Sequence, residues 1–249
     1  MKILTFNTWQ EKGPWQKRWE IIFQGLEKYR PEVAAFQEVF NADWAREAQK
    51  RAGYGFLVFP PEPSGLMFLS RFPVTQWGSL VMKTQSTTEE YLRYGLFAEL
   101  EAGENRFAVF NTHLSWRTPE SEIRLKQVHE LSAFIQEKTG DSECAVMGDF
   151  NAAPGTPEIR EMAMRGFTDT FASLCPGDPG LTWDNSNPYA AGSNPKMPDR
   201  RIDYLFIKNP SKILSGLKSV ERVLTLPLNG VFASDHFGLL ADFKGESKW

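Results

Sequence analysis

Hydrophobic positions recur along the chain with two different periods, and these periods predict helices and strands in alternation. Apolar residues have helical spacing between Trp15 and Tyr29, and Pro31 ends that segment. Helices are also predicted over Asp43–Ala52, from Thr118-Pro119 to about Lys138, and from Thr156-Pro157 to Gly166. Alternating or wholly apolar segments predict strands at Lys2–Asn7, Val33–Gln37, Leu66–Ser70, Val74–Met82, Tyr94–Leu100, Arg106–Thr112, Cys144–Gly148, Ile202–Ile207 and Gly238–Phe243.

One long segment, Pro176–Arg201, follows neither period and is rich in Pro, Gly, Asn and Asp. We predict a long loop there, and long loops in compact domains are often functional. Strands and helices continue to the end of the chain without a linker, a short-period repeat or a low-complexity segment. We therefore predict one domain over residues 1–249 with an α/β fold, a sandwich of mixed sheets.

Composition narrows the class of protein. The chain has 249 residues, of which 41% are hydrophobic and 24% charged, as in ordinary globular proteins. Its net charge of −3 and pI of about 5.8 differ from those of a general nucleic-acid coat, which is basic. A phosphate-bearing substrate must therefore be attracted locally, by a metal or by a few basic residues.

The two cysteines and the N-terminal residues indicate the cellular compartment to expect. Cys144 and Cys175 have no CxxC neighbour, which argues against a cysteine zinc site. The first residues turn polar too early for a signal peptide, and no apolar run reaches transmembrane length. We expect a reduced, cytoplasmic monomer without stable membrane insertion.

Polar residues at the ends of apolar strands carry the functional signal. A single polar strand end is commonly a solvated turn, but six such ends together need another explanation. Several carboxylates buried near one another are costly unless a cation or hydrogen bonds compensate their charge. Their oxygens suit magnesium or manganese, and histidine suits proton transfer or oxyanion stabilisation. The polar residues at these ends are Asn7, Glu38, His113, Asp149 with Asn151, Asp203, and Asp235 with His236.

The ordered set of these segments resembles the endonuclease/exonuclease/phosphatase superfamily, which includes deoxyribonuclease I, apurinic endonucleases, neutral sphingomyelinases and tyrosyl-DNA phosphodiesterases. The resemblance runs from Asn7 to Phe243. It implies a four-layer sandwich of two packed mixed β-sheets flanked by helices. The matching segments are Phe6-Asn7-Thr8-Trp9, Phe36-Gln37-Glu38-Val39, Leu69-Ser70-Arg71-Phe72-Pro73, Asn111-Thr112-His113-Leu114, Gly148-Asp149-Phe150-Asn151, Arg201-Ile202-Asp203-Tyr204 and Ser234-Asp235-His236.

The resemblance implies a metal side of the site. Glu38 would be the main ligand of Mg²⁺, or alternatively of Mn²⁺. Asn7 would lie nearby and hold a metal-bound water or the scissile phosphate, and Asp235 would be a second metal-site carboxylate. Whether one or two metals are used is left open.

The resemblance also implies a side that moves protons and binds phosphate. Asp149 would orient or deprotonate the attacking water, and Asn151 would hydrogen-bond the phosphate. His236 would contact a non-bridging phosphate oxygen or act as the general base, with Asp203 fixing its tautomer. His113 would stabilise the pentavalent phosphorus. The expected step is in-line attack of water on a phosphodiester.

Further residues are candidates for substrate contact, with ordinary packing as the alternative. Arg93 or Tyr94 would occupy a phosphate-facing position that family members fill with Tyr or Arg. Trp183 lies in the long loop, in a Thr-Trp pair that resembles the sphingomyelinase-like and tyrosyl-DNA-phosphodiesterase-like members. Trp9 and Trp116 follow two of the polar strand ends and would border the cleft.

The function expected from this reading is hydrolysis of a phosphodiester by a nuclease or nucleic-acid-end phosphodiesterase. A sphingomyelinase-like lipid phosphodiesterase and an inositol-phosphate phosphatase are the alternatives. The phosphatase would need additional basic residues near His113, where the sequence offers only Arg117. A non-catalytic binding module is disfavoured because no key polar residue is missing.

Overall fold

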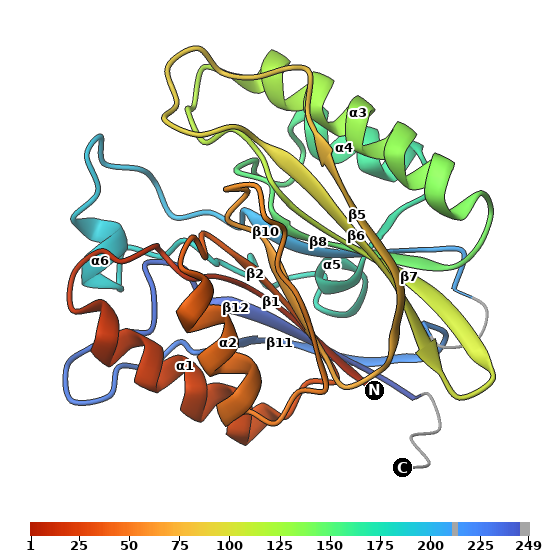
Figure 1. Cartoon of the computed structure of the whole chain (residues 1–249). Helices are drawn as coiled ribbons and strands as arrows, with labels where there is room; N and C mark the ends of the chain where they lie inside the picture. Colours follow the sequence, from red (N-terminus) through yellow and green to blue (C-terminus); the bar gives the residue numbers. More distant parts are fainter. Residues whose placement is uncertain (211–213, 245–249) are drawn as a thin grey trace.

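The computed structural model describes residues 1–210 and 214–244, and these form two six-stranded sheets packed face to face with helices outside (Figure 1). The first sheet has the order β11 (Leu217–Val223), β12 (Gly238–Phe243), β1 (Lys2–Asn7), β2 (Val33–Gln37), β4 (Met67–Ser70) and β3 (Phe56–Val58). The second has the order β5 (Val74–Val81), β6 (Tyr94–Ala102), β7 (Asn105–His113), β8 (Cys144–Asp149), β10 (Asp203–Lys208) and β9 (Thr168–Asp169).

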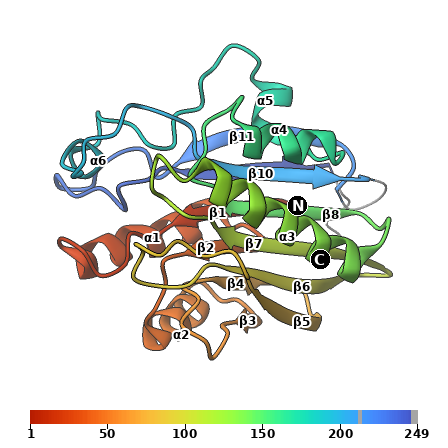
Figure 2. The same ribbon diagram turned by 90° about the horizontal axis from the view of Figure 1, so that it is seen from above.

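Helices cover the outer face of each sheet, as the two views in Figures 1 and 2 show. The first sheet packs against α1 (Trp15–Tyr29) and α2 (Ala42–Arg51), and the second against α3 (Ser121–Thr139) and α4 (Pro157–Met164). Two short helices, α5 (Thr170–Leu174) and α6 (Pro188–Ala191), lie in the later connections. The predicted four-layer sandwich is therefore confirmed.

Alternation along each strand sends side chains to two different apolar layers. In β1, Ile3 joins the cluster between the sheets, while Leu4 and Phe6 join the cluster beneath α1. In β7, Val109 lies between the sheets and Phe110 packs under α3. Each such side chain contributes roughly 1.5–3 kcal/mol when fully buried. The strands near the middle of each sheet are therefore rigid supports for whatever follows their ends.

Most predicted elements are present, but the predicted start of the third long helix is wrong. Thr118-Pro119 does not open it, because α3 begins at Ser121 with Glu120 as its N-cap. The helix begins later because of Arg124. Its guanidinium donates to the carbonyl oxygens of Ser115 (3.2 Å) and Arg117 (2.7 Å) and keeps that segment in a loop.

Several short elements were missed by the sequence patterns. The strands β3, β9 and β11 were not predicted, and the expected long loop contains α6. These elements are short or lie at sheet edges, where exposed faces weaken the hydrophobic signal. Among the described residues, none of the helices has the length and apolar character needed to cross a bilayer.

Candidate active site

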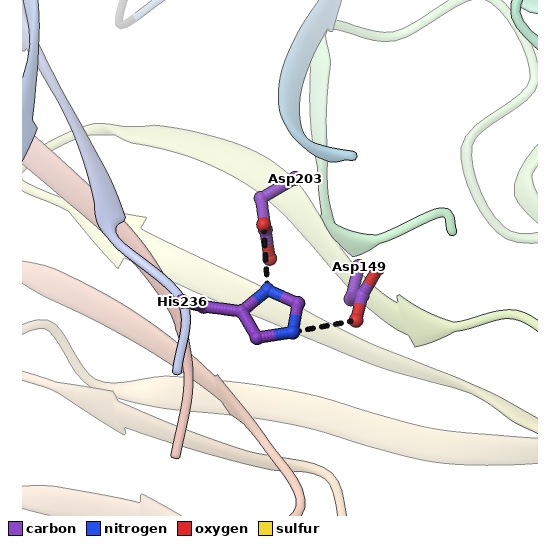
Figure 3. Close-up of side chains that lie close together, drawn as sticks. All are labelled: Asp149, Asp203 and His236. Carbon is purple, nitrogen blue, oxygen red and sulfur yellow. Dashed lines mark hydrogen bonds and ion pairs between the residues drawn. The ribbon is translucent and has the colours of Figure 1, made fainter. Parts of the chain in front are cut away.

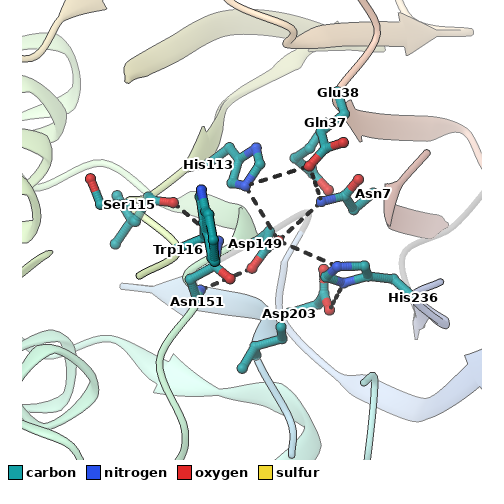
Figure 4. Close-up of polar contacts among 12 residues, drawn as sticks. Asn7, Gln37, Glu38, His113, Ser115, Trp116, Asp149, Asn151, Asp203 and His236 are labelled. Carbon is teal, nitrogen blue, oxygen red and sulfur yellow. Dashed lines mark hydrogen bonds and ion pairs between the residues drawn. The ribbon is translucent and has the colours of Figure 1, made fainter. Parts of the chain in front are cut away.

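Strands from both sheets end at one place and bring their polar residues together. The parallel pairs β1–β2 and β7–β8 end side by side, at Asn7 next to Gln37 and at His113 next to Asp149. Asp203 begins β10 opposite Asp149, and Asp235-His236 lies just before β12, which runs antiparallel to β1. We call these residues the strand-end cluster: Asn7, Glu38, His113, Asp149, Asn151, Asp203, Asp235 and His236. Figure 4 labels all of them except Asp235.

A buried polar link couples the two sheets directly beneath this cluster. The amide nitrogen of Gln37 donates to Thr5 Oγ1 (3.1 Å) and to Asn111 Oδ1 (2.8 Å). The amide of Asn111 donates back to the carbonyl oxygens of Phe36 (2.8 Å) and Met67 (3.2 Å). Asn111 belongs to the second sheet and the other groups to the first. The link fixes the relative position of the two halves of the site, because buried polar groups are costly to leave unpaired.

The backbone is in unusual conformations where the cluster residues leave their strands. Glu38 has φ of 63° and Asn151 has φ of 51°, a left-handed region that non-glycine residues seldom adopt. Gly148 has φ of 141°, and a Cβ there would lie 1.9 Å from the carbonyl oxygen of Thr112. Such strain persists where surrounding contacts impose it and is common at functional sites. It turns Glu38 and Asp149 toward the shared space.

His236 is the cationic member of the cluster. Its Nδ1 lies 2.9 Å from Asp203 Oδ2, and its Nε2 lies 3.7 Å from Asp149 Oδ2 (Figure 3). Burial alone would lower its pKa, but the charges of Asp203, Asp149 and Asp235 outweigh burial and raise the pKa of His236 to about 10. The ring is therefore protonated at neutral pH and donates from both nitrogens, which suits contact with an anionic oxygen.

Asp149 is the most connected carboxylate. It accepts from Asn7 Nδ2 (3.0 Å) and from the backbone N–H of Asn151 (2.9 Å), and His113 Nε2 lies 3.5 Å away. Burial is the main reason that its pKa rises to about 7, with Asp203 adding to the effect. A carboxylate with such a pKa can accept a proton near neutral pH.

His113 is neutral, whereas His236 is protonated. Burial, with the positive charges of Arg93 and His236, holds the pKa of His113 well below the usual range. His113 is therefore a neutral ring, with Nε2 3.9 Å from Glu38 Oε1. Asn151 is held by donation from its amide nitrogen to the Leu114 carbonyl oxygen (3.1 Å) and lines the cavity wall.

Glu38 and Asp235 form the part of the cluster that fits a divalent cation. Both line the cavity, and burial together with the charge of Glu38 raises the pKa of Asp235 to about 6. Crowded, partly desolvated carboxylates of this kind are the oxygen ligands that Mg²⁺ prefers. A direct metal ligand would point its amide oxygen at the cation, but Asn7 points its amide nitrogen toward the carboxylates. Its amide nitrogen bridges Asp149 and Glu38 (3.3 Å), while its oxygen accepts from Trp9 N–H.

Asp149, Asp203 and His236 also bring their ligating atoms within 4.8 Å of one another. Spacing alone would allow them to hold an ion. However, the His236 ring is a cation, so a metal bound at its Nε2 would have to displace a proton, although the 2.9 Å hydrogen bond between Nδ1 and Asp203 could remain. The carboxylates of Glu38 and Asp235 could hold a cation without deprotonation of a histidine.

The cluster opens into a cavity of about 470 Å³ with a wall of aromatic and basic side chains, beside which Glu89 and Glu90 also line the cavity. Three predicted residues, Trp9, Trp116 and Trp183, line it. We call this wall the rim, and its members are Trp9, Tyr91, Trp116, Arg117, Trp183, Tyr189 and Arg200.

The structure places both predicted phosphate-facing residues, Arg93 and Tyr94, away from the cavity. Tyr94 is buried between the sheets as part of β6, and Arg93 is buried in an ion pair with Glu89 (2.7 Å), so neither lines the cavity. Tyr91 lies there instead, and its hydroxyl accepts from Gln10 Nε2 (2.9 Å). Burial and the charge of Glu38 hold the pKa of Tyr91 well above its usual range. β6 begins at Tyr94, as the strand pattern predicted, but the Tyr94 side chain lies between the sheets, whereas Tyr91 belongs to the connection before the strand and lines the cavity.

Four contributors were missed from the sequence: Tyr91, Tyr189, Arg200 and Arg18. Tyr189 stacks on Trp9 with centroids 4.8 Å apart. Arg18 is completely buried and donates to carbonyl oxygens of Thr8 (2.6 Å) and Ala233 (3.1 Å), among others. It therefore ties the loop after β1 to the loop that carries Asp235. The predicted long loop Pro176–Arg201 was the available signal for Tyr189 and Arg200, because long loops in compact domains are often functional; Arg18 gave no signal.

With this geometry established, comparison with known proteins assigns the class. The family model for the Endonuclease/Exonuclease/phosphatase family matches residues 4–236, so this chain belongs to that family. The resemblance drawn from the motifs is confirmed.

Three relatives show the range of the family. The uncharacterized protein F14F9.5 of Caenorhabditis elegans is 26% identical over 290 residues, which cover 98% of this chain and 91% of that protein. The probable RNA exonuclease NGL3 of Saccharomyces cerevisiae is 26% identical over 66% of this chain and 40% of its own length. A Staphylococcus aureus phospholipase C is 25% identical over 61% of this chain and 48% of its own length. This chain thus spans less than half of the last two.

Solved structures show the same fold. TDP2 of D. rerio, complexed with a single-strand DNA product, has a TM-score of 0.80 at 19% identity over 97% of both chains. The beta toxin of Staphylococcus aureus has a TM-score of 0.75 at 18% identity over 98% of this chain and 100% of that one. At such identities the likeness concerns the fold.

Proposed function

We propose that this protein is a divalent-metal-dependent phosphodiesterase that hydrolyses phosphodiesters by in-line attack of water, with nucleic acid strands or their ends as substrates. One observation carries the proposal. A protonated His236, a neutral His113 and a proton-accepting Asp149 converge with Glu38 on one cavity. That set provides hydrogen-bond donors for a phosphate and an acceptor for the proton of water.

Each residue then has a distinct task. Glu38 and Asp235 would hold the cation, and Asn7 would keep Glu38 close to Asp149. When bound, the cation would neutralise charge on the phosphate oxygens. Asp149 would orient the attacking water and take its proton. His236, held by Asp203, would donate to a non-bridging oxygen, and Asn151, His113 and Tyr91 would contact the phosphate from the remaining sides.

The rim supports a nucleic-acid substrate. Aromatic faces bind unstacked bases without regard to sequence, and arginines bind phosphates. TDP2, whose structure contains a single-strand DNA product, and the RNA exonuclease relative act on substrates of this class. The acidic pI favours local capture over tight binding of duplex.

A lipid phosphodiester is the second candidate, and one observation favours it. Leu226 is 78% exposed and Leu228 is 42% exposed in the connection that leads from β11 to His236. Two exposed leucines in one short connection could contact an apolar partner. The phospholipase C relative points in the same direction.

A substrate panel distinguishes these functions. It contains single-stranded DNA, duplex DNA with an abasic site, RNA, a 5′-tyrosyl oligonucleotide, sphingomyelin vesicles and inositol phosphates, each with Mg²⁺, Mn²⁺ or EDTA. We expect turnover of the nucleic-acid substrates with metal and none in EDTA. Undiminished activity in EDTA would contradict the metal requirement. Hydrolysis of sphingomyelin alone would favour the lipid function, and hydrolysis of inositol phosphates alone would favour a phosphatase.

A further inference from the structure

Two arginines on the rim differ from the other half-buried or buried arginines near the site in having most of their donors unused. Arg93, Arg124 and Arg201 each pair with a carboxylate, at 2.7, 2.8 and 2.7 Å, and the side chain of Arg18 donates from all three nitrogens to backbone carbonyl oxygens. Arg117 and Arg200 line the cavity and have no carboxylate partner within 4.0 Å in the described part of the chain. Arg201 is next to Arg200 in sequence, yet only Arg201 has a carboxylate partner among the described residues. The difference therefore depends on where each side chain points and not on the segment of the chain.

The hydrogen bonds of these two side chains are also incomplete. Arg117 donates once, to the carbonyl oxygen of Thr88 (3.0 Å). The side chain of Arg200 makes no hydrogen bond with any residue that the structure describes, and only its Nε is enclosed by protein. The two terminal nitrogens of Arg200 are therefore available to the cavity. A guanidinium offers five donors in a fixed plane, which matches phosphate oxygens.

Both guanidinium groups are held in place without being neutralised. The Arg117 guanidinium carbon lies 4.8 Å from the Trp116 ring centroid, and that of Arg200 lies 6.0 Å from the Trp183 ring centroid. The backbones of Trp183 and Arg200 exchange two hydrogen bonds (3.0 and 2.9 Å), and Trp183 also bridges to His236. The separation between Arg200 and the catalytic histidine is therefore set by backbone pairing.

Holding a cation in a partly desolvated wall has a cost that a counterion offsets. Burial lowers the pKa of Arg200, although Asp149 opposes the effect from the floor of the cavity. Besides the strand-end cluster, the carboxylates that line the cavity are Glu89, which pairs with Arg93 and accepts from the backbone N–H of Trp116, and Glu90, which is exposed. Neither forms an ion pair with Arg117 or Arg200 in the described part of the chain. The missing counterion of the two arginines is therefore best supplied by the ligand.

We propose that Arg117 and Arg200 bind a second anionic group of the substrate, a phosphate that is not hydrolysed, next to the phosphodiester at the strand-end cluster. This inference rests on the proposed phosphodiesterase function and specifies its substrate class. Substrates with successive phosphates, such as nucleic acid strands, engage the two arginines, whereas a diester without a second anion leaves them unused.

The test compares two reporter diesters that differ by one phosphate. The first is thymidine 5′-(p-nitrophenyl phosphate), and the second carries an additional 3′-phosphate. The same pair is made with the reporter at the 3′ position and the additional phosphate at the 5′ position. kcat/KM is measured with Mg²⁺ for the native protein and for Arg200→Gln, Arg117→Gln and Arg200→Lys. Arg106→Gln is the matched control, because Arg106 is 59% exposed at the far end of β7 from His113.

In one of the two orientations, the additional phosphate should raise kcat/KM tenfold or more, as charge-assisted hydrogen bonds do. Arg200→Gln should reduce that advantage to nearly one while changing the rate with the simpler diester less than about threefold. Arg117→Gln should reduce it partly, and Arg200→Lys should keep part of it. Arg106→Gln should keep all of it.

Two results would overturn the inference. If Arg200→Gln lost kcat/KM equally on both diesters, the arginine would act on the scissile phosphate. If the additional phosphate gave no advantage in either orientation, the second anion site would be refuted. If the native protein hydrolyses neither diester, the proposed function fails and the anion site is tested separately by calorimetry. Thymidine 3′,5′-bisphosphate should then bind more tightly than thymidine 5′-monophosphate, and only in proteins that retain Arg200. Equal affinities would refute the site.

Discussion

The strand-end cluster and the rim border the same cavity but are built differently. Cluster side chains such as Asp149 and His236 are 1% and 5% exposed and are fixed by one another at the ends of central strands. Rim residues such as Trp9, Tyr91 and Arg200 are half-buried and come from the connections. Chemistry requires fixed donors and acceptors in a low-dielectric setting, whereas selection of a substrate requires accessible area and charge. Changes in the cluster should therefore lower kcat, and changes in the rim should alter KM and substrate preference.

The largest effect should come from Glu38→Gln. The substitution keeps the size of the side chain but removes the charge of the best-placed metal ligand, so kcat should fall by about 10² to 10³ with little change in KM. Calorimetry with Mn²⁺ should show weakened binding, and the melting temperature should change little. Glu104→Gln, at the exposed turn between β6 and β7, is the matched control. Tight Mn²⁺ binding by the variant would place the metal elsewhere.

Asp203→Asn should have the next largest effect, and it separates proton chemistry from metal binding. The amide cannot stabilise the His236 cation, so we expect a loss of about a hundredfold in kcat. Because Asp203 helps to raise the pKa of His236, the alkaline limb of the pH–rate profile should move to lower pH. Mn²⁺ affinity should stay near that of the native protein. An unchanged alkaline limb would argue against a protonated His236.

Tyr91→Phe tests the border between cluster and rim. Loss of one hydroxyl that faces the phosphate should reduce kcat/KM by up to about tenfold. Tyr94→Phe is the informative comparison, because that ring is buried between the sheets and should leave the kinetics unchanged. If Tyr94→Phe were the impaired variant, the corrected assignment would be wrong.

The smallest effect concerns stability without metal. Between its ordinary pKa of 3.8 and its raised value of about 7, Asp149 holds a proton in the folded state that the unfolded state releases. His236 behaves likewise between 6.5 and about 10. In both ranges the folded state binds more protons, so the free energy of unfolding falls as pH rises. Below pH 6.5 the lowered pKa of His113 opposes this trend, so the decline is expected above pH 7. In EDTA, the melting temperature should fall from pH 7 to pH 9, as the free energy of unfolding decreases by about 1.4 kcal/mol per pH unit.

Two comparisons sharpen that stability prediction. Mg²⁺ should reduce the decline, because a cation compensates the same carboxylates. Asp149→Asn should remove the downward contribution of this carboxyl group below pH 7. A melting temperature in EDTA that rises from pH 7 to pH 9 would contradict the raised pKa of His236. Rim variants such as Arg117→Gln should leave the curve unchanged, because Arg117 faces the cavity from outside the carboxylate group.

The sequence by itself determined the layers and most of the strand-end cluster. Apolar periods locate central strands because those strands are buried on both faces, and a polar residue at the end of such a strand stands out. Val33–Gln37 followed by Glu38, and Cys144–Gly148 followed by Asp149, are clear for this reason. The ordered motifs added the family and the pairing of Asp203 with His236.

Only the tertiary structure decided how the cavity is walled. Tyr91 and Tyr94 are three residues apart in sequence, yet one faces the cavity and the other lies between the sheets. Arg200 and Arg201 are adjacent, yet only Arg201 has a carboxylate partner among the described residues. The Gln37–Asn111 link joins residues 74 positions apart. Connections have no period that fixes where a side chain points. Their conformations depend on partners distant in sequence, and those partners come together only when the two sheets pack.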